Sequence, residues 1–121
     1  MEHTMNQRDV VILAGARTPL GRLNGALSTL TAVELGAAAL RAAIERSGVD
    51  VADIDAVIFG QVLQAGAGQG PARQTSIAAG IGWNVPAITI NKLCLSGLTA
   101  VIDAARLIHT GEAEVVAVGG Q

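Results

Sequence analysis

The chain has 121 residues, half of them hydrophobic, and carries a net charge of −2. The basic residues are spread singly and there are only one Phe and one Trp, which excludes a basic, aromatic-lined nucleic-acid surface. No apolar run approaches the roughly 20 residues of a membrane span. With a single cysteine no internal disulfide forms, which favours a cytoplasmic protein. We expect residues 1–7 to form a flexible tail and residues 8–121 to form one domain.

Four short apolar runs recur along the chain. They are VVILA at 10–14, AVIFG at 56–60, AITI at 87–90 and VVAV at 115–118. Each run is continuous, whereas a strand with one wet face alternates apolar and polar residues. Continuous runs are typical of strands covered on both faces in a parallel sheet. The sequence therefore predicts four strands.

Helical patterns lie between these runs. Thr31 and Glu34 have the spacing of a capping box, and Gly48 supplies a stop for the same helix. A second helix is predicted over residues 71–80, because Pro71 suits a first helical position. A third begins near Cys94 and ends at Gly111. The pattern predicts an α/β fold of βαβαβαβ order, with a mostly parallel sheet covered by helices.

The third helix is apolar nearly all round. One face carries Leu98, Val101, Ile102, Ala105 and Ile108, and Ala100, Ala104 and Leu107 make much of the other face apolar as well. A helix of this kind is buried on both sides. We infer that further polypeptide, a partner subunit, or both cover the face that the sheet does not.

Several familiar sites are excluded by spacing. The stretch GAGQG at 66–70 lacks the third glycine of a dinucleotide loop, and Cys94 and Leu98 stand where a serine-hydrolase elbow needs glycines. Two His and one Cys cannot complete a zinc site of known spacing. His109 follows Cys94 by about 22 Å of helix, too far for a catalytic base. No metal or cofactor is predicted.

Cys94 is the candidate nucleophile. It follows a predicted buried strand and opens a helix, and such a place lowers the pKa of a thiol. Ser96 and Gly97 are small enough to let a substrate approach, and Asn91 is placed to pin the turn by hydrogen bonds to the backbone. The opposing interpretation is a lone buried cysteine that acts as a small hydrophobe. Spacing alone leaves the two open.

Longer stretches resemble one family. The run NKLCLSGLTAV at 91–101 resembles the nucleophile segment of the thiolases. The opening segments of that family are similar, in the same order, to AGARTPLGRLNGAL at 14–27, AVELGAAALRAAIERSGVD at 32–50 and GQVLQAGAGQGPARQTSIAAGI at 60–81. The final EVVAVGGQ also matches a thiolase strand.

The resemblance implies an acyl-CoA C-acyltransferase of fatty acid metabolism. Cys94 would take an acyl group from a coenzyme A thioester, for Claisen condensation or thiolysis, with its own backbone N–H in the oxyanion hole. Coenzyme A thioesters would be substrates, with no separate cofactor. The family's five-layer fold would bury the catalytic helix in a central layer. Its members form homodimers or homotetramers, and we expect the loop from Gln64 to Gln74 to contribute to that contact.

The resemblance also has a limit. Thiolases carry an activating His and a second Cys in a later, C-terminal domain, which is absent from this sequence. We therefore expect residues 8–121 to be an incomplete N-terminal domain, inactive alone. Two alternatives stay open: a ketoacyl synthase-like condensing enzyme of the same fold, and a non-catalytic assembly module.

Overall fold

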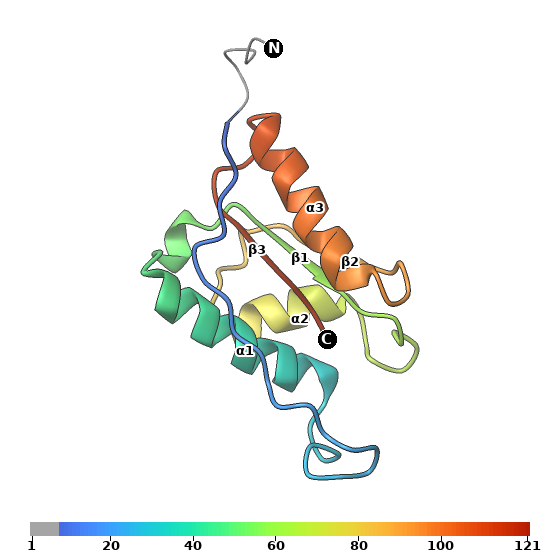
Figure 1. Cartoon of the computed structure of the whole chain (residues 1–121). Helices are drawn as coiled ribbons and strands as arrows, with labels where there is room; N and C mark the ends of the chain where they lie inside the picture. The colour runs from blue at the N-terminus through green and yellow to red at the C-terminus, as the bar shows by residue number, and fades with distance from the viewer. Residues whose placement is uncertain (1–7) are drawn as a thin grey trace.

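The computed structural model describes residues 8–121, so the predicted flexible tail lies outside the described residues. A three-stranded parallel sheet lies between helices (Figure 1). A short 3₁₀ turn over Val51–Asp53 precedes the first strand. In chain order the main elements are α1 (Ala32–Ser47), β1 (Ala56–Gly60), α2 (Pro71–Ala78), β2 (Ala87–Ile90), α3 (Ser96–His109) and β3 (Val116–Gly120).

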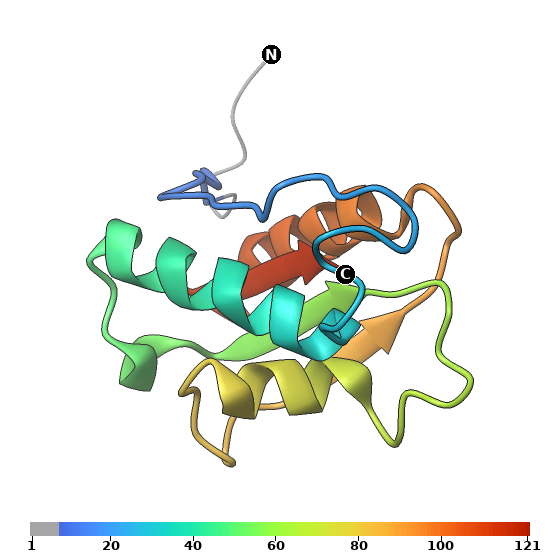
Figure 2. The same cartoon turned by 90° about the horizontal axis from the view of Figure 1, so that it is seen from below.

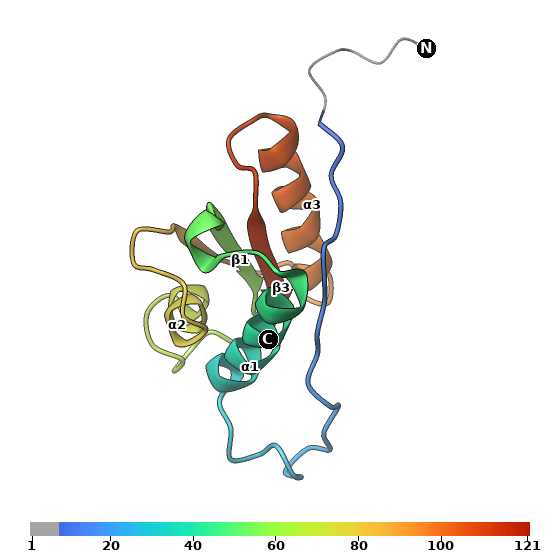
Figure 3. The same ribbon diagram turned by 90° about the vertical axis from the view of Figure 1, so that its left-hand side faces the viewer.

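The sheet has the order β2-β1-β3, with helices on both faces. Figure 3 shows α3 on one face and α1 and α2 on the other. The central strand β1 is buried at Val57, Ile58 and Phe59, as a strand covered on both sides must be. The α/β prediction of a parallel sheet covered by helices is confirmed, with three strands instead of four.

The ends of α1 follow from local chemistry. Thr31 Oγ1 accepts a hydrogen bond from the amide of Glu34 at 3.1 Å, and a Glu34 carboxylate oxygen accepts one from the amide of Thr31 at 2.7 Å. The pKa of Glu34 lies below its usual value. The larger cause is the hydrogen bond from the backbone of Thr31, and the smaller is the hydrogen bond with its side chain. Gly48, at φ 71°, ends the helix in the left-handed region. The predicted capping box is confirmed.

The predicted strand over residues 10–14 is wrong. This segment runs as an irregular trace outside the sheet (Figure 2). It is not paired with any strand of the sheet, and together with α1, α3 and β3 it lines an apolar cavity of about 240 Å³. Val11, Ile12 and Leu13 are 69%, 82% and 59% exposed. An apolar run becomes a strand only where a neighbouring strand forms backbone hydrogen bonds with it.

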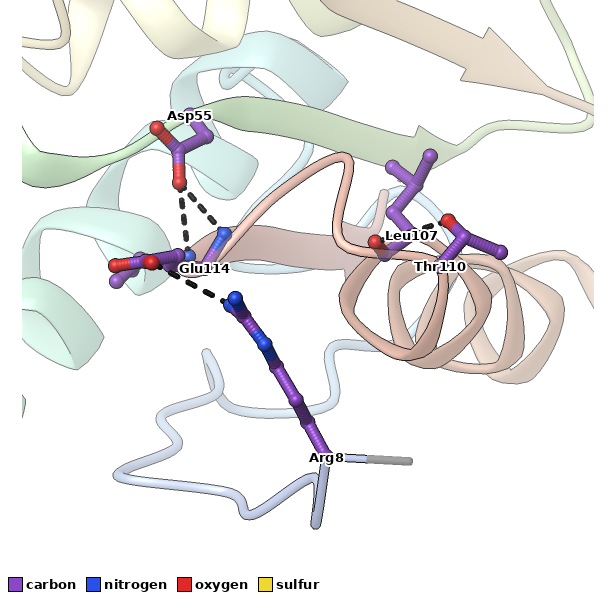
Figure 4. Close-up of polar contacts among 6 residues, drawn as sticks. Arg8, Asp55, Leu107, Thr110 and Glu114 are labelled. Carbon is purple, nitrogen blue, oxygen red and sulfur yellow. Dashed lines mark hydrogen bonds and ion pairs between the residues drawn. The ribbon is translucent and has the colours of Figure 1, made fainter. Parts of the chain in front are cut away.

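A carboxylate joins the beginnings of β1 and β3. Asp55 Oδ2 accepts hydrogen bonds from the amides of Glu114 at 2.8 Å and Val115 at 3.1 Å (Figure 4). Both hydrogen bonds lower the pKa of Asp55, and the one from the amide of Glu114 has the larger effect. The side chain of Glu114 also pairs with Arg8 at 3.3 Å. These contacts set the register in which β3 enters the sheet.

Helix α3 begins at Ser96 and ends at His109, two residues inside each predicted end. Its side with Ala100 and Ala104 is buried against the sheet. The opposite side leaves Leu98 58% and Ile102 42% exposed. The helix therefore has an apolar face that residues 8–121 leave partly uncovered. None of the described helices is long and apolar enough to cross a bilayer.

Candidate active site

The carboxyl ends of the three strands meet at one edge of the sheet. Because the strands are parallel, β1 ends there at Gly60, β2 at Ile90 and β3 at Gly120. Four residues beyond β2 comes Cys94, in the turn that leads into α3 (Figure 1). The carboxyl edge of a parallel sheet is the usual place for a ligand in α/β proteins.

Two side chains hold the cysteine turn, residues 91–96. Asn91 Oδ1 accepts a hydrogen bond from the amide of Leu93 at 3.0 Å, and Asn91 Nδ2 donates to the carbonyl of Val62 at 3.3 Å. Ser96 Oγ accepts from the amide of Lys92 at 2.8 Å and donates to the carbonyl of Leu93 at 2.6 Å. Asn91 thus makes the backbone hydrogen bonds that its position predicts.

Leu93 turns the chain immediately before Cys94. Its φ is 50°, in the left-handed region that a branched side chain adopts at an energetic cost. The bonds that Asn91 and Ser96 make to its amide and carbonyl offset that cost. Strained residues of this kind cluster at functional sites, where neighbouring contacts maintain them.

The start of α3 crosses closely over β1 and β3. A Cβ on Gly60 would lie 2.6 Å from the carbonyl carbon of Ser96, and a Cβ on Gly97 would lie 3.8 Å from Gly120. Ser96 is 4% exposed and its hydroxyl is fully used by the turn. That the small size of Ser96 and Gly97 lets a substrate approach stays a prediction. Within the described residues the tight contact between helix and sheet is made at Gly60 and Ser96, while a Cβ on Gly97 would make only ordinary contact.

Cys94 itself faces outward. Its side chain is exposed, contrary to the interpretation of a buried small hydrophobe. Among residues 8–121 its amide donates no hydrogen bond, and that N–H is free for an external acceptor. His109 is the last residue of the 14-residue α3, about 20 Å along the axis from the turn. No three His, Cys, Asp or Glu residues of the described chain gather as a metal site.

Sequence reasoning missed Gln61. This residue follows β1 directly, is 4% exposed, and bonds through its side chain to two different segments. The signal available in the sequence was a long polar side chain at the end of a fully apolar strand. Its partners, Leu63 and Gln121, were not predictable because one of them is 60 positions away.

Comparison with known families identifies the chain. The family model described as "Thiolase, N-terminal domain" matches residues 10–121. The chain belongs to the thiolase family. That match favours a thiolase over the ketoacyl synthase-like alternative.

Similar proteins agree with this thiolase assignment. A "Probable acetyl-CoA acetyltransferase" of Mycobacterium tuberculosis is 57% identical over 111 residues, which are 92% of this chain and 28% of that protein. A cytosolic acetyl-CoA acetyltransferase of Gibberella zeae is 48% identical over 115 residues, 95% of this chain and 29% of that protein. The chain thus spans about three tenths of the length of the relatives it matches.

A solved thiolase structure has the same fold. The Acat5 thiolase from Ascaris suum, crystallised in complex with coenzyme A, superimposes with a TM-score of 0.92 at 41% sequence identity. The match covers 93% of this chain and 30% of that one. The described thiolase fold thus comprises three parallel strands and three helices, with the cysteine turn at the carboxyl edge.

Proposed function

We propose that the protein is an acyl-CoA C-acyltransferase and that Cys94 accepts the acyl group. The observation that carries the proposal is an exposed thiol beside an unengaged backbone N–H, at the carboxyl edge of a thiolase N-terminal domain. An exposed thiol can meet a thioester in solution, and a free amide can bind the oxygen that gains charge.

The first half-reaction exchanges one thioester for another. The Cys94 sulfur, as thiolate, attacks the carbonyl carbon of the acyl-CoA, and the electron pair of the C=O bond moves to oxygen. The amide of Cys94 donates a hydrogen bond to that oxyanion. When the C=O bond reforms, the bond to the coenzyme A sulfur breaks, and the departing thiolate takes a proton from water. The product is an acyl-enzyme on Cys94.

The second half-reaction moves the acyl group from Cys94 to the α-carbon of another acyl-CoA or, in thiolysis, to coenzyme A. Condensation needs a base that removes the α-proton. Within residues 8–121, Cys94 is the only cysteine and His109 lies at the far end of α3. We therefore propose that these 121 residues perform the first half-reaction and no net condensation or thiolysis.

Release of coenzyme A tests the proposal. The chain is incubated with acetyl-CoA, and free coenzyme A is separated and quantified over time. We expect at most one equivalent per chain from the wild type and none above background from Cys94→Ala. Equal release from Cys94→Ala would show that Cys94 does not accept the acyl group, and release of many equivalents would contradict the limit to one half-reaction.

We also propose that the protein works in the cytoplasm as a homodimer or homotetramer. A cytosolic relative and a free thiol support the location. The uncovered apolar side of α3 supports burial against further polypeptide, and the loop from Gln64 to Gln74 is proposed as part of the contact between copies. Analytical ultracentrifugation of the chain, with Leu98→Glu as the comparison, measures how far that face contributes to assembly.

A further inference from the structure

Three polar side chains meet in the interior next to the cysteine turn. Gln61 follows β1, Thr75 lies in α2 and Gln121 follows β3. Thr75 Oγ1 donates to Gln121 Oε1 at 2.7 Å, and Gln121 Nε2 donates to Gln61 Oε1 at 2.9 Å. Thr75 is fully buried and Gln61 is 4% exposed. Buried amides need such partners, so each side chain fixes the position of the next.

The network continues into the loop after β1. Gln61 Nε2 donates to the carbonyl of Leu63 at 2.8 Å, and Gln64 Nε2 donates to the carbonyl of Gln61 at 2.8 Å. These two bonds constrain the backbone on either side of Val62, at the carbonyls of Gln61 and Leu63. The carbonyl of Val62 is the group to which Asn91 Nδ2 donates, and Asn91 Oδ1 in turn holds the amide of Leu93.

We propose that Gln61 is a positioning residue for Cys94, acting through the Val62 carbonyl and Asn91. The proposal rests on the proposed function, in which Cys94 accepts the acyl group. The left-handed Leu93 needs support to hold its conformation, and a Val62 carbonyl free to move would loosen Asn91 and then Leu93. Gln61 thereby couples the orientation of the cysteine to α2 and to the end of β3.

The test compares two glutamines of one region. Gln61→Met keeps the side-chain volume and removes both amide bonds. Gln74→Met is the matched control, because Gln74 Nε2 donates to the carbonyls of Ala67 and Gln69, in the same loop, and has no bond to Asn91. Three quantities are measured on the 121-residue chain: hydrogen exchange of the Leu93 amide and of the Val57 amide by NMR, and alkylation of Cys94 by iodoacetamide across a pH series.

Gln61→Met should raise Leu93 exchange several-fold and change the pH profile of Cys94 alkylation, while the exchange of the core amide of Val57 stays near wild type. Gln74→Met should leave all three measurements unchanged. The proposal is overturned if Leu93 exchange and alkylation in Gln61→Met match the wild type, or if Gln74→Met changes them equally. It is also overturned if Leu93 and Val57 accelerate together, since that is loss of global stability.

Gln61→Glu covers the case in which Gln61→Met does not fold. This variant keeps the oxygen that accepts from Gln121, removes the N–H donor to the Leu63 carbonyl and, when ionised, places a negative charge beside that carbonyl. We expect the same direction of change, and wild-type behaviour would overturn the proposal. Neither readout uses acetyl-CoA, so failure of the wild type to release coenzyme A counts against the proposed function alone.

Discussion

The cysteine turn, residues 91–96, and the N-terminal segment, residues 10–14, are both irregular backbone beside a sheet strand, yet they differ in how they are held. The turn has side-chain hydrogen bonds at both ends and a buried serine between helix and sheet. The segment exposes most of its apolar surface and borders a cavity. Irregular backbone is fixed where side chains satisfy its polar groups, and apolar sequence alone does not fix it.

The difference between the cysteine turn and residues 10–14 also matters for function. A nucleophile must present its sulfur in a set direction, because misplacement by about 1 Å reduces catalysis strongly. The bonds of Asn91 and Ser96 supply that rigidity to Cys94. Residues 10–14 line the cavity with apolar side chains. Among the described contacts they form no hydrogen bond with the turn. Substitutions in the two regions should therefore differ widely in effect.

The largest effect is expected at Gly60. In Gly60→Ala the new Cβ would meet the backbone of Ser96 and Gly97, which cannot move without displacing α3 from the sheet. We expect a loss of about 3 kcal/mol in the free energy of unfolding. Gly15→Ala is the control, because a Cβ at Gly15 meets nothing within 4 Å. Urea unfolding measures the midpoints of Gly60→Ala and Gly15→Ala. Equal midpoints would show that α3 does not pack tightly over Gly60.

A pH-dependent effect is expected at Asp55, next to the entry of β3. Its pKa in the folded chain lies below the ordinary value of about 4, so the ionised carboxylate stabilises the fold above that value. This stabilisation is lost as the pH falls through the folded pKa. Asp55→Asn should therefore lower the urea midpoint at neutral pH and converge with the wild type once the pH has fallen below the folded pKa of Asp55.

Asp53→Asn is the control for this carboxylate. Asp53 lies two positions earlier, and its side chain accepts no hydrogen bond within residues 8–121. We expect its urea midpoint to stay near that of the wild type at neutral pH, because no side-chain hydrogen bond is lost. If Asp55→Asn and Asp53→Asn follow the same pH curve, the bonds to Glu114 and Val115 do not stabilise the sheet.

The smallest effect is expected in the N-terminal segment. Leu13 is 59% exposed, so Leu13→Ser should change the free energy of unfolding by no more than about 0.5 kcal/mol. Val57→Ala, in the buried strand β1, should cost about 2 kcal/mol and provides the comparison. A loss for Leu13→Ser as large as that for Val57→Ala would mean that the segment packs into the core.

The sequence predicted most of the fold where local signals suffice. The runs at 56–60 and 87–90 are strands to the residue, and α1 follows its capping box. The prediction of a strand over residues 10–14 is wrong because a strand also needs a neighbouring strand with which to form hydrogen bonds. The start of α3 was placed two residues early, because the bonds of Asn91 and Ser96 keep Cys94 in a turn.

The site was predictable in part for the same reason. Asn91 acts on backbone two positions away, which a short motif can show. The contacts of Gln61, Thr75 and Gln121 join residues 46 and 60 positions apart, and only the packing of β1, α2 and β3 brings them together. Sequence separation on that scale leaves no local pattern to recognise.

Mass mapping of the acyl group tests the central claim most directly. The wild-type chain is exposed to acetyl-CoA, digested at acidic pH to preserve thioesters, and its peptides are sequenced by mass spectrometry. The account predicts one acetyl group, on the sulfur of Cys94. Acetyl found instead on the neighbouring Lys92, or on no residue at all, would contradict the assignment of Cys94 as the acyl acceptor.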